Sequence, residues 1–373
     1  MRTDHIYIHF PFCKKKCPYC DFFSLVPGNM KEYREYIDRL HREADLYEEY
    51  FSDNIKTVYF GGGTPSLMDP DDLREILLRF KTGGDAEVTL EVNPATADYG
   101  KLKAFMEAGV TRLSVGSQSF IDAELRTLGR IHGVNDIYEG YEAARKAGCG
   151  NMNLDLITGI PGSTPAGALY SASELCRLEP EHVSVYILTY YEGTPFTSLL
   201  SSGRLKKLED DVEIELFSLA AGVLARHGFE RYEISNFSKP GRRSAHNMNT
   251  WDFGNYIGLG ASAHSFLEKF RWENPQDLAS YYKKVETRSS GIITGNEVQE
   301  KDLKNEFLML GLRKISGLNV NDYAKIFGTP VGSDFEKLDY YINKGVLLCG
   351  NDTIRLPQNM LDVFNSVVSD III

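Results

Sequence analysis

The stretch Tyr7-Ile8-His9-Phe10-Pro11-Phe12-Cys13-Lys14-Lys15-Lys16-Cys17-Pro18-Tyr19-Cys20-Asp21-Phe22 decides how the rest of the chain is interpreted. Its three cysteines have the spacing C-x3-C-x2-C and follow a short apolar run that is typical of a strand. Thiolates this close together can bind one metal centre, and cysteine thiolates are the usual ligands of iron–sulfur clusters. Three thiolates would leave the fourth iron of a [4Fe–4S] cluster without a protein ligand, so an external ligand could bind there.

Three alternative roles for these cysteines stay open. A disulfide would leave one cysteine unpaired, and nothing before the motif indicates secretion. A structural zinc ion usually takes four protein ligands, and no second C-x2-C pair lies nearby. Buried cysteines without a function are disfavoured because Lys14, Lys15, Lys16 and Asp21 make the loop polar.

The composition indicates a globular protein of about two domains. Of 373 residues, 42% are hydrophobic and 25% are charged. The 41 Lys and Arg residues against 52 Asp and Glu residues give a net charge of −11, which disfavours a nucleic-acid partner because such proteins need a basic face.

We expect a cytoplasmic protein without a membrane span. The first residues lack the pattern of a signal peptide, and no apolar run reaches the roughly 18 residues that a spanning helix needs. Outside the motif, Cys149, Cys176 and Cys349 are isolated, which fits a reducing compartment.

Strand-like runs alternate with amphipathic runs up to about residue 190, which predicts βαβ units and a parallel sheet. The expected strands are Ile6–His9, Thr57–Phe60, Val88–Val92, Arg112–Gly116, Asn153–Ile157 and Val183–Leu188. The expected helices are Met30–Tyr50, Asp71–Phe80, Tyr99–Ala108, Val134–Ala147 and Ala166–Leu178.

Polar and glycine-rich segments follow these strands at their carboxyl ends. They are the cysteine loop, Gly61-Gly62-Gly63-Thr64-Pro65, Glu91-Val92-Asn93-Pro94, Ser117-Gln118-Ser119, Asp155 and Thr189-Tyr190. Active sites of barrels are built at this end. Because six strands cannot close an eight-stranded barrel, we predict an α/β fold of the open (β/α)6 type, a partial TIM barrel with a lateral cleft.

Residues 1–265 are expected to form this barrel with an irregular extension, and residues 275–373 a small helical, winged-helix-like C-terminal domain. The C-terminal helices are expected at Glu306–Ile315, Asn321–Phe327 and Asp334–Asn343. A hairpin is expected to turn at Gly350-Asn351-Asp352.

Single residues at the strand ends suggest ligand contacts. Glu91 and Asp155 are carboxylates on strands expected to be buried, where they need hydrogen bonds or a paired charge. A structural pair with arginine is the alternative. Arg130 could hold a ligand carboxylate in a two-pronged salt bridge.

Several motifs together resemble the radical S-adenosylmethionine (SAM) proteins related to oxygen-independent coproporphyrinogen III oxidase. The motifs are YIHFPFC-x3-CPYCDF, GGGTPS, EVNP, RLSVGSQSF, LGRIH, NLDLITGIPGST, HVSVYIL-x-YYEGTPF, YEISNF and GLGASAH. The resemblance implies a [4Fe–4S] cluster on Cys13, Cys17 and Cys20. It implies SAM contacts from Tyr7, Tyr19, Gly63, Thr64, Glu91, Gln118, Arg130, Asp155, Thr189 and His264.

Two functions compete within this resemblance. The oxidase removes carboxylates from a porphyrinogen, whereas HemW-type heme chaperones bind heme and pass it to an acceptor protein. Phe22 stands where the oxidase has a fourth cysteine, and 12 residues precede Cys13 where the oxidase has a long extension. Both features favour the chaperone, with an electron donor as a further partner.

The segment His246-Asn247-Met248-Asn249-Thr250-Trp251 resembles the HNxxYW motif of the chaperones, with Thr250 in place of tyrosine. A histidine is a standard axial ligand of heme iron, so His246 is the candidate heme ligand. We expect it on a polar loop, where Arg242 and Arg243 could pair with heme propionates.

Overall fold

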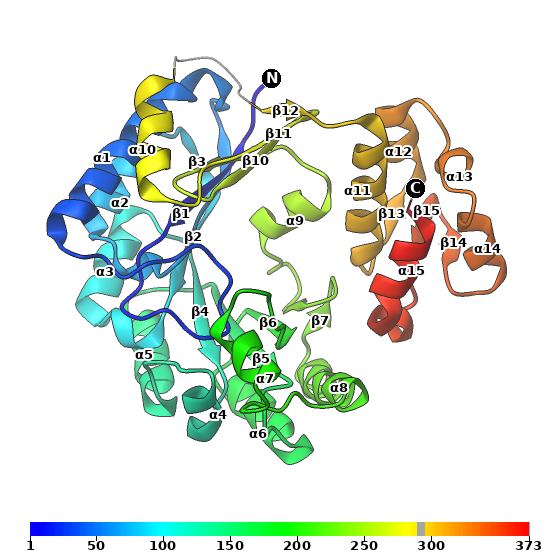
Figure 1. Ribbon diagram of the computed structural model, residues 1–373, viewed down its shortest axis with the longest axis horizontal. Helices are drawn as coiled ribbons and strands as arrows, with labels where there is room; N and C mark the ends of the chain where they lie inside the picture. The colour runs from blue at the N-terminus through cyan, green and yellow to red at the C-terminus, as the bar shows by residue number, and fades with distance from the viewer. Residues whose placement is uncertain (289–294, 373) are drawn as a thin grey trace.

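The fold is built around a nine-stranded sheet, and six of its strands run parallel in chain order. The computed structural model describes residues 1–288 and 295–372. The six strands are β1 (His5–Phe10), β2 (Ile55–Gly62), β3 (Thr82–Val92), β4 (Arg112–Gln118), β5 (Met152–Thr158) and β6 (His182–Ile187). Figure 1 shows them as an open, curved wall, which confirms the predicted partial barrel.

Helices cover the outer face of this wall because alternate strand residues are apolar. Ile6, Ile8 and Phe10 of β1 are fully buried in one core with Tyr36 and Leu40 of α1. The outer helices are α1 (Met30–Leu46), α2 (Pro70–Leu77), α3 (Tyr99–Ala108), α4 (Asp122–Thr127), α5 (Val134–Lys146) and α6 (Pro165–Arg177). Four 3-10 helices are η1 (Glu48–Tyr50), η2 (Pro65–Leu67), η3 (Pro94–Thr96) and η4 (Gln358–Val363).

Short strands that the sequence did not predict cover both edges of the parallel sheet. β9 (Ile257–Leu259) pairs in parallel with β1, and β8 (Asn236–Ser238) pairs antiparallel with β6 and with β7 (Glu230–Arg231). Directly after β9, Gly260 has φ +96, and a Cβ atom there would lie 2.5 Å from the carbonyl oxygen of His9. Only glycine permits this close approach of β9 to β1.

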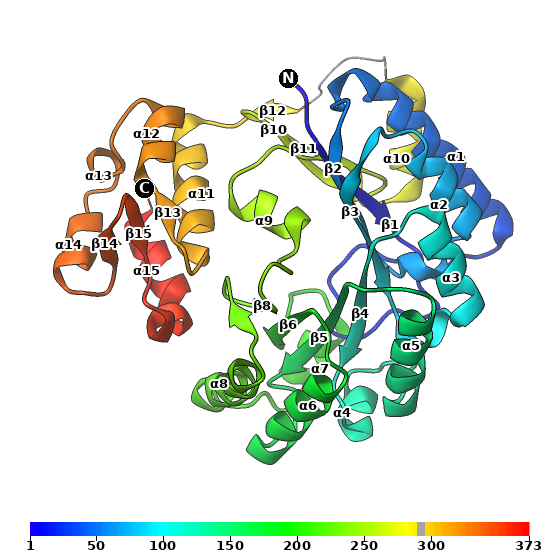
Figure 2. The ribbon, with the colours of Figure 1, turned by 180° about the vertical axis from the view of Figure 1, so that it is seen from behind.

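The irregular part after β6 contains one long helix and two short ones. They are α7 (Pro195–Ser201), α8 (Asp210–Arg226) and α9 (Ala245–Trp251), of which α8 is the long one. A separate three-stranded sheet consists of β10 (His264–Leu267), β11 (Phe270–Glu273) and β12 (Asn296–Glu297). Figures 1 and 2 show α9 between the barrel and α11 (Glu300–Arg313).

The C-terminal region is helical with a small sheet, as predicted. After α11 its helices are α12 (Val320–Phe327), α13 (Val331–Asp334), α14 (Leu338–Asn343) and α15 (Phe364–Ile371). Its strands are β13 (Leu318–Asn319), β14 (Leu348–Gly350) and β15 (Thr353–Arg355). The turn between β14 and β15 has positive φ at Asn351 and Asp352, as a two-residue hairpin requires. The expected single helix over Asp334–Asn343 is wrong, because α13 ends at Asp334 and α14 begins at Leu338.

The helix α10 (Leu278–Thr287) packs with the barrel, although it lies after residue 275, where the C-terminal domain was expected to begin. Its Tyr281 and Val285 belong to the barrel's core, whereas Phe307 and Leu308 of α11 belong to a second core. We therefore propose that the C-terminal domain starts after α10 rather than at residue 275. Within the described residues, no helix has both the length and the apolar character needed to cross a membrane.

Candidate functional site

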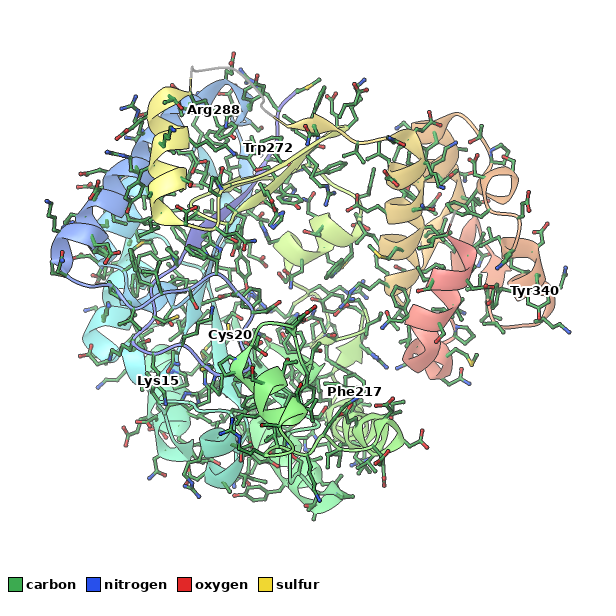
Figure 3. All side chains as sticks on the ribbon, in the orientation of Figure 1. Lys15, Cys20, Phe217, Trp272, Arg288 and Tyr340 are labelled. Atoms are coloured by element: carbon green, nitrogen blue, oxygen red, sulfur yellow. The ribbon has the colours of Figure 1, made fainter. Side chains whose placement is uncertain are left out.

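A cavity of about 390 Å³ lies inside the barrel at the carboxyl ends of the strands. Eight of the ten residues predicted to contact SAM line it: Tyr19, Gly63, Thr64, Glu91, Gln118, Arg130, Asp155 and Thr189. Cys20 lines it as well, and Figure 3 shows Cys20 on the loop beside α7. Most of the residues predicted to contact SAM therefore lie around one cavity.

The cysteine loop is held by backbone contacts that need glycine on its neighbours. A Cβ atom on Gly63 would lie 2.7 Å from the carbonyl carbon of Pro11, and one on Gly129 would lie 2.6 Å from Cδ of Pro18. At the end of the loop, Nε2 of His9 lies 2.9 Å from the carbonyl oxygen of Phe23. The loop thus packs closely against the residues that follow β2 and α4, and His9 contacts the backbone at its end.

The three thiols lie close enough for their charges to influence one another. Burial raises the pKa of Cys13, and it raises the pKa of Cys20 to about 11. For Cys13 this shift is opposed by the hydrogen bond that Thr64 Oγ1 donates to its Sγ at 3.3 Å and by the charge of Arg130. Arg130 Nη1 also donates to Cys17 Sγ at 3.7 Å. Hydrogen bonds and a positive charge at the sulfurs suit thiolates that bind a metal cluster, so these residues fit a [4Fe–4S] group.

Across the described ranges, no three His, Cys, Asp or Glu side chains converge on a position for one metal ion. A cluster of four irons separates its thiolate ligands, because each binds a different iron.

Arg130 lies between the cysteine loop and β4, where most of its donors are used. Nη2 donates to the carbonyl oxygen of Gly116 at 3.0 Å, while Nη1 faces Cys17 and Tyr19 Oη. Its buried Nε has no partner in the part of the chain that the structure describes. The two-pronged clamp on a ligand carboxylate stays a prediction.

Glu91 and Asp155 lie on the inner wall of the cavity. Tyr59 Oη donates to Glu91 Oε1 at 2.9 Å and the Gly62 amide donates to Oε2 at 3.2 Å. Burial raises the pKa of Glu91 to about 7, and these hydrogen bonds oppose the shift. Burial also raises the pKa of Asp155, against a hydrogen bond of 2.7 Å from Asn153 Nδ2. Among the described residues neither carboxylate has a hydrogen bond or a close ion pair with an arginine, but the charge of Arg112 lowers the pKa of both acids at longer range. The expected alternative, a structural pair with arginine, therefore stays open.

Two predicted contact residues do not line the cavity. Tyr7 stacks on Tyr59, which does line the cavity, with ring centroids 6.2 Å apart. His264 is exposed on β10, with Nε2 3.6 Å from a carboxylate oxygen of Glu273.

The expectation of a loop position for His246 is wrong, because this residue lies in the first turn of α9 and is 8% exposed. Glu87 accepts hydrogen bonds from the amides of Ala245 and His246, which anchors the helix to β3. Nδ1 of His246 lies 2.8 Å from Thr57 Oγ1, and burial lowers the pKa of the ring to about 3. His246 is therefore neutral, and it lies 5.1 Å from the ring of Tyr59, which lines the cavity.

The sequence did not predict the inner wall itself. Arg112, Ser114, Asn153, Ser184 and Tyr186 line the cavity. They occupy alternate positions on β4, β5 and β6, so a polar pattern of period two on otherwise apolar strands could have found them.

Comparison with known proteins places these features in context. Residues 7–169 match the Radical SAM superfamily. The chain is 34% identical to the heme chaperone HemW of Bacillus subtilis over 88% of each chain. It is 30% identical to the heme chaperone HemW of Lactococcus lactis, over 98% of this chain and 96% of that one. The solved structure of coproporphyrinogen III oxidase (HemN) from Escherichia coli superposes with a TM-score of 0.84 at 20% identity, over 99% of this chain and 89% of that one.

Proposed function

Because the chain belongs to the HemW family of radical SAM proteins, we propose that it is a heme chaperone, which binds heme and transfers it to an acceptor protein. The observation that carries this proposal is the identity to curated heme chaperones over nearly the whole chain. Phe22, at the position of the oxidase's fourth cysteine, supports the same choice. We place the protein in the cytoplasm on its cysteine usage.

The cavity residues would hold two cofactors. Cys13, Cys17 and Cys20 would bind the [4Fe–4S] cluster, and the glycine-rich end of β2, Glu91 and Asp155 would bind SAM. Glu91 and Asp155 are carboxylate acceptors inside a cavity, which suits the hydroxyl and ammonium groups of that cofactor. When bound, the cluster would supply an electron to SAM from an external donor.

Loss of any motif cysteine should abolish the cluster. After anaerobic reconstitution with iron and sulfide, the wild-type protein should be brown and should give a cluster-type paramagnetic signal on reduction. Cys13→Ser, Cys17→Ser and Cys20→Ser should each lose most of the bound iron, while the matched variant Cys176→Ser, a buried cysteine of α6, should keep it. Full iron content in a motif variant would refute the assignment.

Replacement of His246 should weaken heme binding. Its neutral ring has Nδ1 bonded to Thr57, so within the described residues Nε2 is left without a hydrogen bond and can act as an iron ligand. We expect His246→Ala to raise the Kd for hemin about tenfold or more and to change the Soret band. His227→Ala, at the end of α8, is the control and should bind hemin like the wild type.

The oxidase is the alternative, and its support is the shared fold. An anaerobic assay of the cluster-loaded protein with reductant, SAM and coproporphyrinogen III separates the two functions. We expect hemin binding without decarboxylated product, and product formation would favour the oxidase.

A further inference from the structure

Arg112, at the start of β4, has a buried guanidinium group without an acceptor among the residues that the structure describes. It is 2% exposed and it lines the cavity. Among the described residues its side chain has no hydrogen bond or ion pair, and its Nε is buried without a partner. A buried cation is costly unless an anion pairs with it, so this position suits an anionic ligand.

The two acids in the same cavity act on Arg112 only at longer range. Both carboxylate oxygens of Glu91 already accept hydrogen bonds, from Tyr59 and from the Gly62 amide. Asp155 accepts from Asn153. These acids balance part of the charge of Arg112 at a distance, but they form no hydrogen bond with its donors.

Next to Arg112 in the sheet register lies a second group without a partner. Thr89 of β3 is opposite Arg112, and within residues 1–288 and 295–372 its buried hydroxyl has no hydrogen bond. The guanidinium group of Arg112 therefore lines the cavity, and the hydroxyl of Thr89 lies on the neighbouring strand. A guanidinium group binds a carboxylate through two parallel hydrogen bonds.

Other parts of the cavity are aromatic and accessible. Phe22 is 61% exposed, and Tyr186 and Tyr191 are exposed at the same cavity. Aromatic faces bind flat apolar molecules. A flat molecule that carries carboxylates on one edge matches both the aromatic groups and the arginine.

We propose that Arg112 binds a carboxylate of the tetrapyrrole inside the barrel. This inference rests on the proposed heme binding and assigns the carboxylate contact to the inner wall. The exposed loop arginines Arg242 and Arg243, which the sequence suggested for this contact, are then dispensable for it.

The experiment compares hemin with hemin dimethyl ester, in which both carboxylates are methylated. Binding of each ligand to the full-length protein is titrated in the same low-detergent buffer. The wild type should bind hemin about tenfold more tightly than the ester, as expected for a lost hydrogen-bonded charge pair. In Arg112→Gln the two affinities should become equal, and Arg112→Lys should keep part of the preference. Arg226→Gln, on the exposed end of α8, should keep the wild-type preference.

Three results would overturn the inference. The first is equal wild-type affinity for the two ligands, which decides the matter even if Arg112→Gln does not fold. The second is an unchanged preference in a folded Arg112 variant, and the third is loss of the preference in a double Arg242→Gln/Arg243→Gln variant instead. Absence of saturable hemin binding by the wild type would refute the proposed function as well, whereas the three results above leave it standing.

Discussion

At the scale of single residues, the cysteine loop depends on a contact between Gly62 and His9. Gly62 has φ +108, and a Cβ atom there would lie 2.6 Å from the imidazole ring of His9. That ring contacts Tyr7 Oη at 3.1 Å and the carbonyl oxygen of Phe23 at 2.9 Å. His9 can therefore keep these contacts only while position 62 has no side chain.

Gly62→Ala should destabilise the protein by more than backbone strain alone. The matched control is Gly148→Ala, because Gly148 has φ +93 but no atom within 4 Å of the place where a methyl group would lie. We expect the control to cost about 1–2 kcal/mol in free energy of unfolding, and Gly62→Ala about 2 kcal/mol more as the His9 contacts are lost. Urea unfolding of both variants measures this difference, and equal losses would show that His9 moves aside freely.

At the scale of elements, α9 is held by a carboxylate from the sheet. Glu87 of β3 accepts hydrogen bonds from the amides of Ala245 and His246 and from the hydroxyl of Ser244. A carboxylate at a helix N-terminus also interacts favourably with the helix dipole. The position of His246 is thus set by a residue about 160 positions earlier in the chain.

Glu87→Gln should loosen α9 while the rest of the fold stays intact. A loss of about 1.4 kcal/mol would increase hydrogen exchange of the α9 amides about tenfold. The comparison variant is Asn319→Ala, which removes the side-chain cap of α12 and should increase exchange there but not in α9. Unchanged exchange in α9 of Glu87→Gln would contradict the anchoring role.

The elements also show what the sequence could predict. The six long strands are buried along most of their length, so their apolar runs mark them clearly, and the polar residues that follow them were placed at one end of the barrel. β7, β8 and β9 have two or three residues, too few for a period to appear. The helix around His246 lacks an apolar period, and its start is held by Glu87, a tertiary contact, as well as by the side-chain cap of Ser244. Arg112 was assigned only to a strand, because its lack of a partner is visible in three dimensions alone.

At the scale of the whole molecule, Arg313 is one of several charged residues that join the C-terminal region to the barrel's irregular part. Arg313 of α11 lies 2.6 Å from a carboxylate oxygen of Glu233, which is fully buried. The same guanidinium lies 4.4 Å from the ring centroid of Trp251 at the end of α9. α9 is therefore fixed at its start by the sheet and at its end by the C-terminal region.

Buried neutral histidines should make the whole fold sensitive to mild acid. Burial lowers the pKa of His132 to about 4 and that of His246 to about 3, while unfolded histidine titrates near 6.5. Stability from these residues is present above pH 6.5 and is lost as the pH falls from there towards the folded-state values, by about 1.4 kcal/mol per pH unit and histidine. Glu91 has the opposite sign, because its raised pKa gives stability that is lost as the pH rises from 4.5 to about 7.

Urea unfolding of the cluster-free protein at about pH 7 and about pH 5.5 tests this balance. His132→Gln should lose less stability between the two values than the wild type, and Glu91→Gln should lose more. The same pH dependence in all three proteins would contradict these pKa directions.

The pairing of β9 with β1 has a consequence for synthesis on the ribosome. β1 is made first, but the strand that covers its outer edge is about 250 residues away. Throughout translation of the intervening chain, that edge stays an open template for foreign strands. In the nascent protein the cysteine loop therefore follows a strand with one unpaired edge. The sheet is complete only when Ile257–Leu259 has been synthesised and has paired with β1.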